Sequence, residues 1–206
     1  MKIIYSEVYN KIKPDENLLF ELEKILPERF FLAYTIQFKR LAMILKDRFK
    51  KRVSGFSQVL GCSKIAKQKH ILLLSGGDFH ATNLLKYAEN IVVFDGKNLF
   101  KLGKSEKEKI EAENKAKFAR ILHSNSIGML VSIKPGQYNI KQILKLKQVL
   151  LKLNKTPHFF IFDTLNPEDL ENFQIDFWIN TACPGLGCDL KNVINSQTFF
   201  ALLNPT

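Results

Sequence analysis

The chain has 206 residues, of which 46% are hydrophobic, and it carries a formal net charge of +11. This apolar content suffices for a packed core, and no stretch approaches the roughly 18 uninterrupted apolar residues of a membrane span. We therefore expect a globular protein with no membrane segment. Because residues 1–10 lack the apolar core of a signal peptide, we also expect it in the cytoplasm. The lysines are spread along predicted helices and no nucleic-acid motif is visible, so we expect no direct binding to nucleic acid.

The first half of the chain predicts strands that alternate with helices. A short strand is expected at Lys2–Tyr5, and Asp15 begins a helix whose leucines share one face. Further strands are expected at 30–36, 71–75 and 90–95, an extended segment at 53–62, and helices at 38–49 and 81–89.

The second half repeats this alternation after a connecting segment, Gly96–Lys104. Ser105 and Glu108 have the spacing of a capping box, which predicts a helix that begins at Ser105. Strands are expected at 127–133, 158–163 and 177–181, a helix at 140–151, a helix start at Asn166-Pro167, and a last apolar run at 199–203. The alternation predicts an α/β protein with mostly parallel sheets, and the same order on both sides of Gly96 suggests two similar units.

Two of the three cysteines follow predicted strands. Cys62 ends the extended segment, directly after a glycine, and Cys183 comes after the apolar run Phe177–Thr181. Parallel sheets bind ligands beyond the carboxyl ends of their strands, so both thiols are candidate ligands. Their separation of 121 positions fits no local metal motif, and simple packing is an alternative for each. Cys188, with no histidine nearby, is better interpreted as structural.

Two turns could also contribute to a site. Lys134-Pro135-Gly136-Gln137 lies between a strand and a helix, an arrangement in which backbone N–H groups can bind an anion. An ordinary strand-to-helix turn is an equally good interpretation. His80 follows a glycine turn and could be a ligand or a proton carrier, although a histidine that merely caps a turn or packs is more common.

Six segments resemble, in order, the archaeal and eukaryotic diphthamide synthase family, over essentially the whole chain. They are Thr35–Phe38, Gln58–Cys62, Phe79-His80, Lys134–Gln137, Asn166–Glu168 and Asn180–Pro184. The resemblance implies a radical enzyme whose 4Fe-4S cluster is held by three cysteines, one from each of three similar domains. S-adenosylmethionine would occupy the open cluster position, and its 3-amino-3-carboxypropyl group would be added to one histidine of translation elongation factor 2.

Carried over residue by residue, the resemblance matches Cys62 to the second-domain ligand and Cys183 to the third-domain ligand. It places Gln37, His80, Lys134, Gly136 and Gln137 at the S-adenosylmethionine site. The two sulfurs are then expected to face one cleft between the domains, without Cys188.

No residue matches the first-domain cysteine, so the resemblance implies that the first domain is missing. We expect two similar three-layer domains, 29–104 and 105–206, preceded by a remnant strand and helix of the first domain in 1–28. A separate N-terminal fragment would then supply the first domain and the third cysteine, as in a split enzyme, and a dimer is possible.

The sequence departs from the family pattern in two places. Gly185 stands where the family has arginine after Cys-Pro, and Ser75–Asp78 replaces a turn that ends in arginine. These losses favour an alternative, a non-catalytic accessory or electron-delivery subunit. A third possibility is a metal-free module that binds an anion at Lys134–Gln137.

Overall fold

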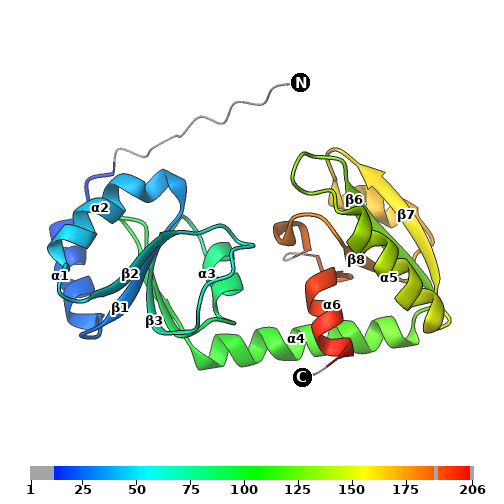
Figure 1. The fold of residues 1–206 in the computed structure, drawn as a ribbon, viewed down its shortest axis with the longest axis horizontal. Helices are drawn as coiled ribbons and strands as arrows, with labels where there is room; N and C mark the ends of the chain where they lie inside the picture. Colours follow the sequence, from blue (N-terminus) through cyan, green and yellow to red (C-terminus); the bar gives the residue numbers. More distant parts are fainter. Residues whose placement is uncertain (1–11, 188–189, 205–206) are drawn as a thin grey trace. The chain divides into compact units, whose positions relative to one another are not determined.

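The computed structural model describes residues 12–187 and 190–204, so the strand expected at Lys2–Tyr5 and the thiol of Cys188 lie outside the described residues. The chain divides into two compact units, 1–108 and 109–206, which are described separately here (Figure 1). Each is a sheet with helices packed against it. In the part of the chain that the structure describes, no helix is long and apolar enough to cross a membrane.

The first unit contains a five-stranded sheet in the order β2-β1-β3-β4-β5. Its strands are β1 (Phe30–Tyr34), β2 (Val53–Gln58), β3 (Gln68–Leu74), β4 (Ala88–Phe94) and β5 (Leu99–Leu102). The first four are parallel, and β5 runs antiparallel to β4. The carboxyl ends of β1, β2 and β3 therefore lie at one edge of the sheet.

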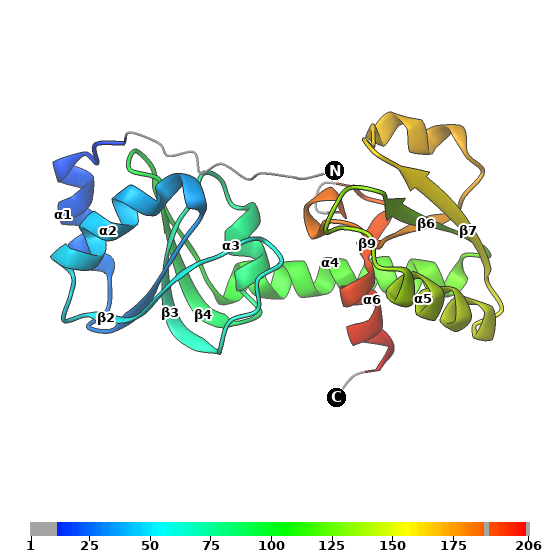
Figure 2. The same cartoon turned by 45° about the horizontal axis from the view of Figure 1, so that its top comes forward.

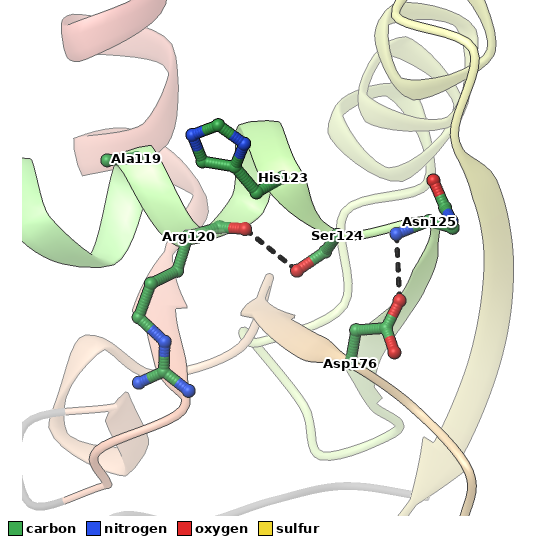
Figure 3. Close-up of a pocket in the computed structure, with 6 residues that line it drawn as sticks. All are labelled: Ala119, Arg120, His123, Ser124, Asn125 and Asp176. Atoms are coloured by element: carbon green, nitrogen blue, oxygen red, sulfur yellow. Dashed lines mark hydrogen bonds between the residues drawn. The ribbon is translucent and has the colours of Figure 1, made fainter.

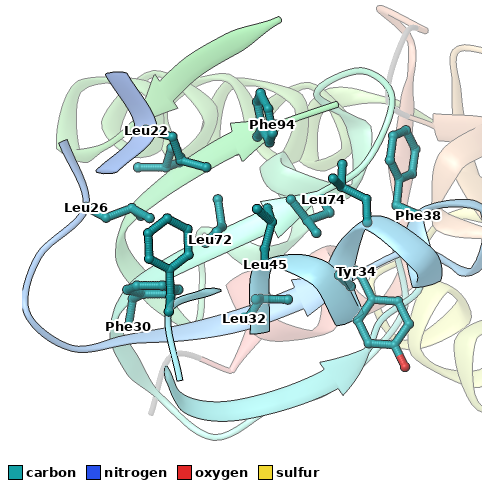
Figure 4. Close-up of a cluster of buried hydrophobic side chains, with 14 of the residues drawn as sticks. Leu22, Leu26, Phe30, Leu32, Tyr34, Phe38, Leu45, Leu72, Leu74 and Phe94 are labelled. Carbon is teal, nitrogen blue, oxygen red and sulfur yellow. The ribbon is translucent and has the colours of Figure 1, made fainter. Parts of the chain in front are cut away.

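Helices α1 (Glu16–Ile25) and α2 (Lys39–Arg48) pack on one face of this sheet. Asp15 caps α1 as expected, because its carboxylate accepts hydrogen bonds from the N–H groups of Asn17 and Leu18. Figure 4 shows the resulting core, with Leu22 and Leu26 beside Phe30, Leu32, Tyr34, Phe38, Leu45, Leu72, Leu74 and Phe94. Helix α1, which was expected as a remnant of a preceding domain, thus contributes to the core of this unit.

Two details of the first unit differ from the sequence-based expectation. Helix α3 covers Phe79–Leu84, not 81–89, because Ala88 already pairs with Gln68 as the first residue of β4. The segment expected as a plain connection contains β5. Its hairpin turn forms because the Asp95 carboxylate accepts from the N–H groups of Lys97 and Asn98 while Gly96 adopts a φ of +92°.

The second unit contains a four-stranded, fully parallel sheet in the order β7-β6-β8-β9. Its strands are β6 (Ser126–Ser132), β7 (Thr156–Phe162), β8 (Phe177–Asn180) and β9 (Val193–Asn195). In chain order this is the arrangement 2-1-3-4, which the first four strands of the other unit also have. The expected similarity of the two units is therefore present in their topology.

Helices cover one face of the second sheet (Figure 2). They are α4 (Lys104–His123), α5 (Ile140–Lys152) and α6 (Ser196–Leu203), which bury Ile121, Leu146 and Phe199 against the sheet. The 3-10 helix η2 (Pro167–Asn172) contributes Leu170 to a smaller cluster with Leu130 and Trp178. The architecture is thus α/β with mostly parallel sheets, as the sequence predicts.

The expected start of α4 was wrong. The helix begins at Lys104, and the carboxylate of Glu106, not of Glu108, accepts from the N–H of Gly103 at 2.9 Å. Only the glutamate half of a capping box is therefore formed, two residues before the predicted position, because Gly103 has no side-chain oxygen to return a hydrogen bond. Glu108 instead forms an exposed ion pair with Lys104, at 3.6 Å.

Candidate functional site

Three segments meet at the carboxyl edge of the first sheet. Gln37 lies in the 3-10 helix η1 (Ile36–Phe38) that follows β1, Cys62 lies in the loop after β2, and His80 lies in the first turn of α3 after β3. Because β2, β1 and β3 are parallel neighbours, the three segments leave the sheet at the same edge. The sequence-predicted residues of this unit are therefore gathered at the edge where α/β proteins bind ligands.

The Cys62 loop is attached to the sheet by backbone and side-chain hydrogen bonds. The Val59 N–H donates to the Tyr34 carbonyl at 2.8 Å, which extends the pairing beyond β2. A tight turn follows, in which the Ser63 N–H donates to the Leu60 carbonyl and the Ser63 Oγ accepts from the Leu60 N–H. Cys62 projects from this turn as a free, exposed thiol.

Gly61 brings the Cys62 loop against the start of α3. A Cβ at Gly61 would lie 2.4 Å from Phe79 Cε1, so only glycine allows the ring to pack on this backbone. The Phe79 ring in turn contacts His80, with ring centroids 5.0 Å apart. Burial lowers the pKa of the His80 imidazole from its ordinary 6.5, and its buried Nδ1 has no hydrogen-bond partner among the described residues. The Phe79 ring thus separates the His80 imidazole from the backbone of the Cys62 loop.

In the second unit, Cys183 follows β8 as expected. Its carbonyl accepts from the Leu186 N–H at 3.0 Å, which begins the short 3-10 helix η3 (Pro184–Gly187). The Asn180 side chain donates to the same carbonyl at 2.8 Å. Cys183 is a free, half-buried thiol on a turn that is fixed at several points.

The turn that carries Lys134, Gly136 and Gln137 follows β6, the neighbour of β8, at the same edge of this sheet. The Gln137 N–H donates to the Lys134 carbonyl at 3.0 Å, and Gly136 adopts a φ of +80°. Lys134 and Gly136 are exposed. However, α5 begins only at Ile140 and is capped by Asn139, so this turn lies before the first turn of the helix. The charge of the Lys134 side chain, and not the N-terminus of α5, is therefore the main feature of this turn that would attract an anion.

The structure therefore places every predicted site residue at the carboxyl edge of its own sheet. The two cysteines follow different strands of the shared topology, since Cys62 comes after the edge strand β2 and Cys183 after the inner strand β8. Within residues 12–187 and 190–204, no three His, Cys, Asp or Glu side chains are grouped as a metal site. Joint ligation by Cys62 and Cys183 stays a prediction.

An open depression of about 500 Å³ lies at the opposite, amino end of β6 (Figure 3). Its carboxylate, Asp176, accepts from the N–H groups of Asn125 and Ser126, and these bonds lower the pKa of Asp176 from its ordinary 3.8. The Arg120 guanidinium lies over the Phe177 ring, 5.2 Å from its centroid. Asp176 and Arg120 therefore stabilise the amino ends of β6 and β8. The predicted site residues of this unit lie at the opposite, carboxyl ends of these strands.

Sequence reasoning missed the two asparagines that support the Cys183 turn. Asn180 was noted only as part of a motif, and Asn195 was not singled out. A signal was present for Asn180, because a polar residue ends an apolar strand and the structure leaves only 1% of it exposed. Asn195 could not be found in this way, because β9 itself is only three residues long.

Comparison with known proteins gives a consistent result. Residues 1–203 match the model of the family described as "Putative diphthamide synthesis protein". The chain is 26% identical over 145 residues to a 2-(3-amino-3-carboxypropyl)histidine synthase of Pyrococcus horikoshii, an alignment that covers 69% of this chain and 42% of that protein.

The fold is also similar to solved structures of Dph2 from Pyrococcus horikoshii. One gives a TM-score of 0.80 at 20% identity, covering 96% of this chain and 64% of the other. A second, solved with a 4Fe-4S cluster, gives 0.76 at 20% identity and covers 91% and 60%. This chain thus spans less than two thirds of the length of these relatives. Because the family model covers nearly the whole chain, this protein belongs to the diphthamide synthesis protein family.

Proposed function

We propose that this chain is the C-terminal part of a diphthamide synthase. The reaction is transfer of a 3-amino-3-carboxypropyl group from S-adenosylmethionine to a histidine of translation elongation factor 2, in the cytoplasm. One observation carries the proposal: each unit of a chain from this family presents a free cysteine at the carboxyl edge of its sheet. The name of the Pyrococcus relative supports the transferase activity.

Cys62 and Cys183 are proposed as two thiolate ligands of a 4Fe-4S cluster. The donor set fits, because both thiols are free and follow strand ends, with Cys62 exposed and Cys183 half-buried, and because iron–sulfur clusters are held by cysteine thiolates. The related structure that contains a 4Fe-4S cluster supports this assignment. When bound, the cluster would supply the electron for cleavage of S-adenosylmethionine. A third thiolate from outside these 206 residues, on an N-terminal fragment, completes the set.

The remaining predicted site residues act on the substrate. Lys134 attracts the carboxylate of the methionine portion, and the Gly136-Gln137 backbone leaves room for it at an exposed turn. Gln37, exposed after β1, is available for polar contacts with the same molecule. His80 contributes an imidazole whose Nδ1 has no hydrogen-bond partner among the described residues and whose pKa is lowered by burial.

The test is co-expression of this chain with the N-terminal domain of a family member, followed by anaerobic purification. We expect a complex with a brown cluster that transfers the aminocarboxypropyl group to elongation factor 2. Cys62→Ala and Cys183→Ala should each abolish iron binding and transfer together. Cys188→Ala is the matched control and should retain both.

An accessory, electron-delivering role is the second candidate, favoured by Gly185 and Asp78 at positions where the family has arginine. A complex that keeps a stable cluster but never modifies elongation factor 2 would establish this role in place of catalysis. A complex that stays colourless with iron and sulfide would exclude both the synthase and the electron-delivering role. The remaining interpretation would be a metal-free module that binds an anion. Sedimentation of the same sample measures whether the assembly is a dimer.

A further inference from the structure

The Cys183 turn is held by a hydrogen-bond network that starts at the last residue of β8. Asn180 is 1% exposed, and its Nδ2 donates to the Cys183 carbonyl and to Asn195 Oδ1, both at 2.8 Å. Its Oδ1 accepts from the Ala182 N–H at 2.9 Å. One buried side chain therefore binds the backbone on both sides of the peptide that leads to the cysteine.

A second asparagine binds the turn from the neighbouring strand. Asn195 ends β9, pairs in register with Asn180, and donates from Nδ2 to the Pro184 carbonyl at 3.0 Å. Gly187 closes the turn directly on this side chain, since a Cβ there would lie 2.8 Å from Asn195 Oδ1. The residues before and after the Cys183 side chain are thus tied to two adjacent strand ends.

The chemistry of the network requires amides. Asn180 must donate to two oxygens and accept from one N–H, so only one orientation of its amide satisfies all three partners. Aspartate has the same shape but no donor, and it would place a carboxylate oxygen against the Cys183 carbonyl and Asn195 Oδ1. The network therefore predicts that Asn180→Asp is far more disruptive than its size suggests.

We propose that Asn180 and Asn195 are positioning residues that fix the backbone of the Cys183 turn and so set the geometry in which its thiolate meets the iron–sulfur cluster. This inference rests on the function proposed above. Groups that hydrogen-bond around a metal ligand orient it and tune the metal, and a fixed turn needs no ordering when the cluster binds.

The experiment compares four variants in the full chain. Asn180→Asp removes both donors, and Asn195→Asp is the milder variant, because it loses only the bond to Pro184 and still accepts from Asn180. Thr181→Val is the matched stability control. It deletes the buried hydrogen bond from Thr181 Oγ1 to the Leu130 carbonyl, at 2.7 Å, without touching the Cys183 carbonyl. Asn172→Asp, on an exposed residue, controls for the added charge.

Two readouts are used. In the metal-free chain, exchange of the Leu186 amide reports the bond to the Cys183 carbonyl, and loss of the asparagine donors should accelerate it about ten-fold. In the assembled complex, the electron paramagnetic resonance spectrum of the reduced cluster should shift in Asn180→Asp and Asn195→Asp. Both readouts should stay as in the wild type for Asn172→Asp, and Thr181→Val should leave the spectrum unchanged at comparable loss of stability.

Unchanged Leu186 exchange in both asparagine variants overturns the inference, whether or not a cluster forms. An equal spectral shift in Thr181→Val also overturns it, because the effect would then be general destabilisation. If Asn180→Asp fails to fold, the Leu186 exchange rate and the cluster spectrum of Asn195→Asp decide whether the inference holds. If the wild-type complex never binds iron, the proposed function fails, and the exchange rates still decide whether the asparagines hold the turn.

Discussion

Replacing Gly61 by alanine tests the contact between the Cys62 loop and α3. The added Cβ would lie 2.4 Å from Phe79 Cε1 and 2.5 Å from Phe79 Cζ. Carbon atoms pack best at about 3.5–4.0 Å, so the ring must retreat by about 1 Å or more. Overpacking of this kind costs about 1–3 kcal/mol, and because Phe79 is only half-buried we expect the lower part of this range.

The displacement should also be visible at His80, whose ring packs on Phe79. When the Phe79 ring moves, water reaches the imidazole, and the lowered pKa of His80 should return toward its ordinary 6.5. The assay is urea denaturation for the stability and an NMR titration of the His80 ring for the pKa. Both changes should occur together in Gly61→Ala.

Gly76→Ala is the matched control in the same region. The nearest atom to its added Cβ is Phe38 Cζ at 4.0 Å, and Gly76 does not have a positive φ. This substitution should change the stability by less than about 1 kcal/mol, because alanine fits and mainly restricts the unfolded chain. The reasoning is refuted if Gly61→Ala has the stability and the His80 titration of Gly76→Ala.

Three further outcomes are expected. Lys134→Glu should weaken binding of S-adenosylmethionine to the assembled complex about ten-fold, measured by calorimetry, because it reverses the charge at an exposed turn; equal affinity would remove Lys134 from the site. His80 has a lowered pKa in the folded protein, so the unfolded chain binds a proton at higher pH than the folded chain, and stability falls as the pH drops below about 6.5. Urea denaturation at pH 5.5 and 7.5 should show this loss of stability, and His80→Phe should reduce it. Asp176 also has a lowered pKa, so its hydrogen bonds from Asn125 and Ser126 stabilise the fold above pH 3.8 and are lost in stronger acid. Asp176→Asn should therefore be less stable than the wild type near pH 7 and should lose less stability on acidification. Parallel acid unfolding curves of the two proteins would contradict this role.

The sequence alone determined the features that depend on neighbouring residues. Asp15 was identified as a helix cap because a carboxylate that precedes an amphipathic run can accept from the first free N–H groups, and the structure has these bonds. Apolar runs identified most of the strands, and the end of one of them placed Cys183 at the carboxyl edge of a parallel sheet, whereas Cys62 was placed by a segment predicted only as extended. Periodicity and capping are local, so a single sequence reports them.

Tertiary structure decided the features in which two local solutions compete or in which the partner is distant in sequence. Ser105 with Glu108 and Gly103 with Glu106 both fit a helix start, and the structure uses the second. Strands β5 and β9 are too short to be recognised from their own pattern, and pairing with β4 and β8 defines them.

The packing of α1 against the first sheet was likewise decided by long-range contacts. Its leucine face is buried in the core of the first sheet, and Arg52, which lies just before β2, adds hydrogen bonds to the carbonyls of Glu23 and Pro27. The support of Cys183 is of the same kind, because Asn180 and Asn195 meet only when β8 and β9 pair in register. The sequence thus placed the two thiols at strand ends, whereas side-chain contacts between strands determined how the Cys183 turn is held.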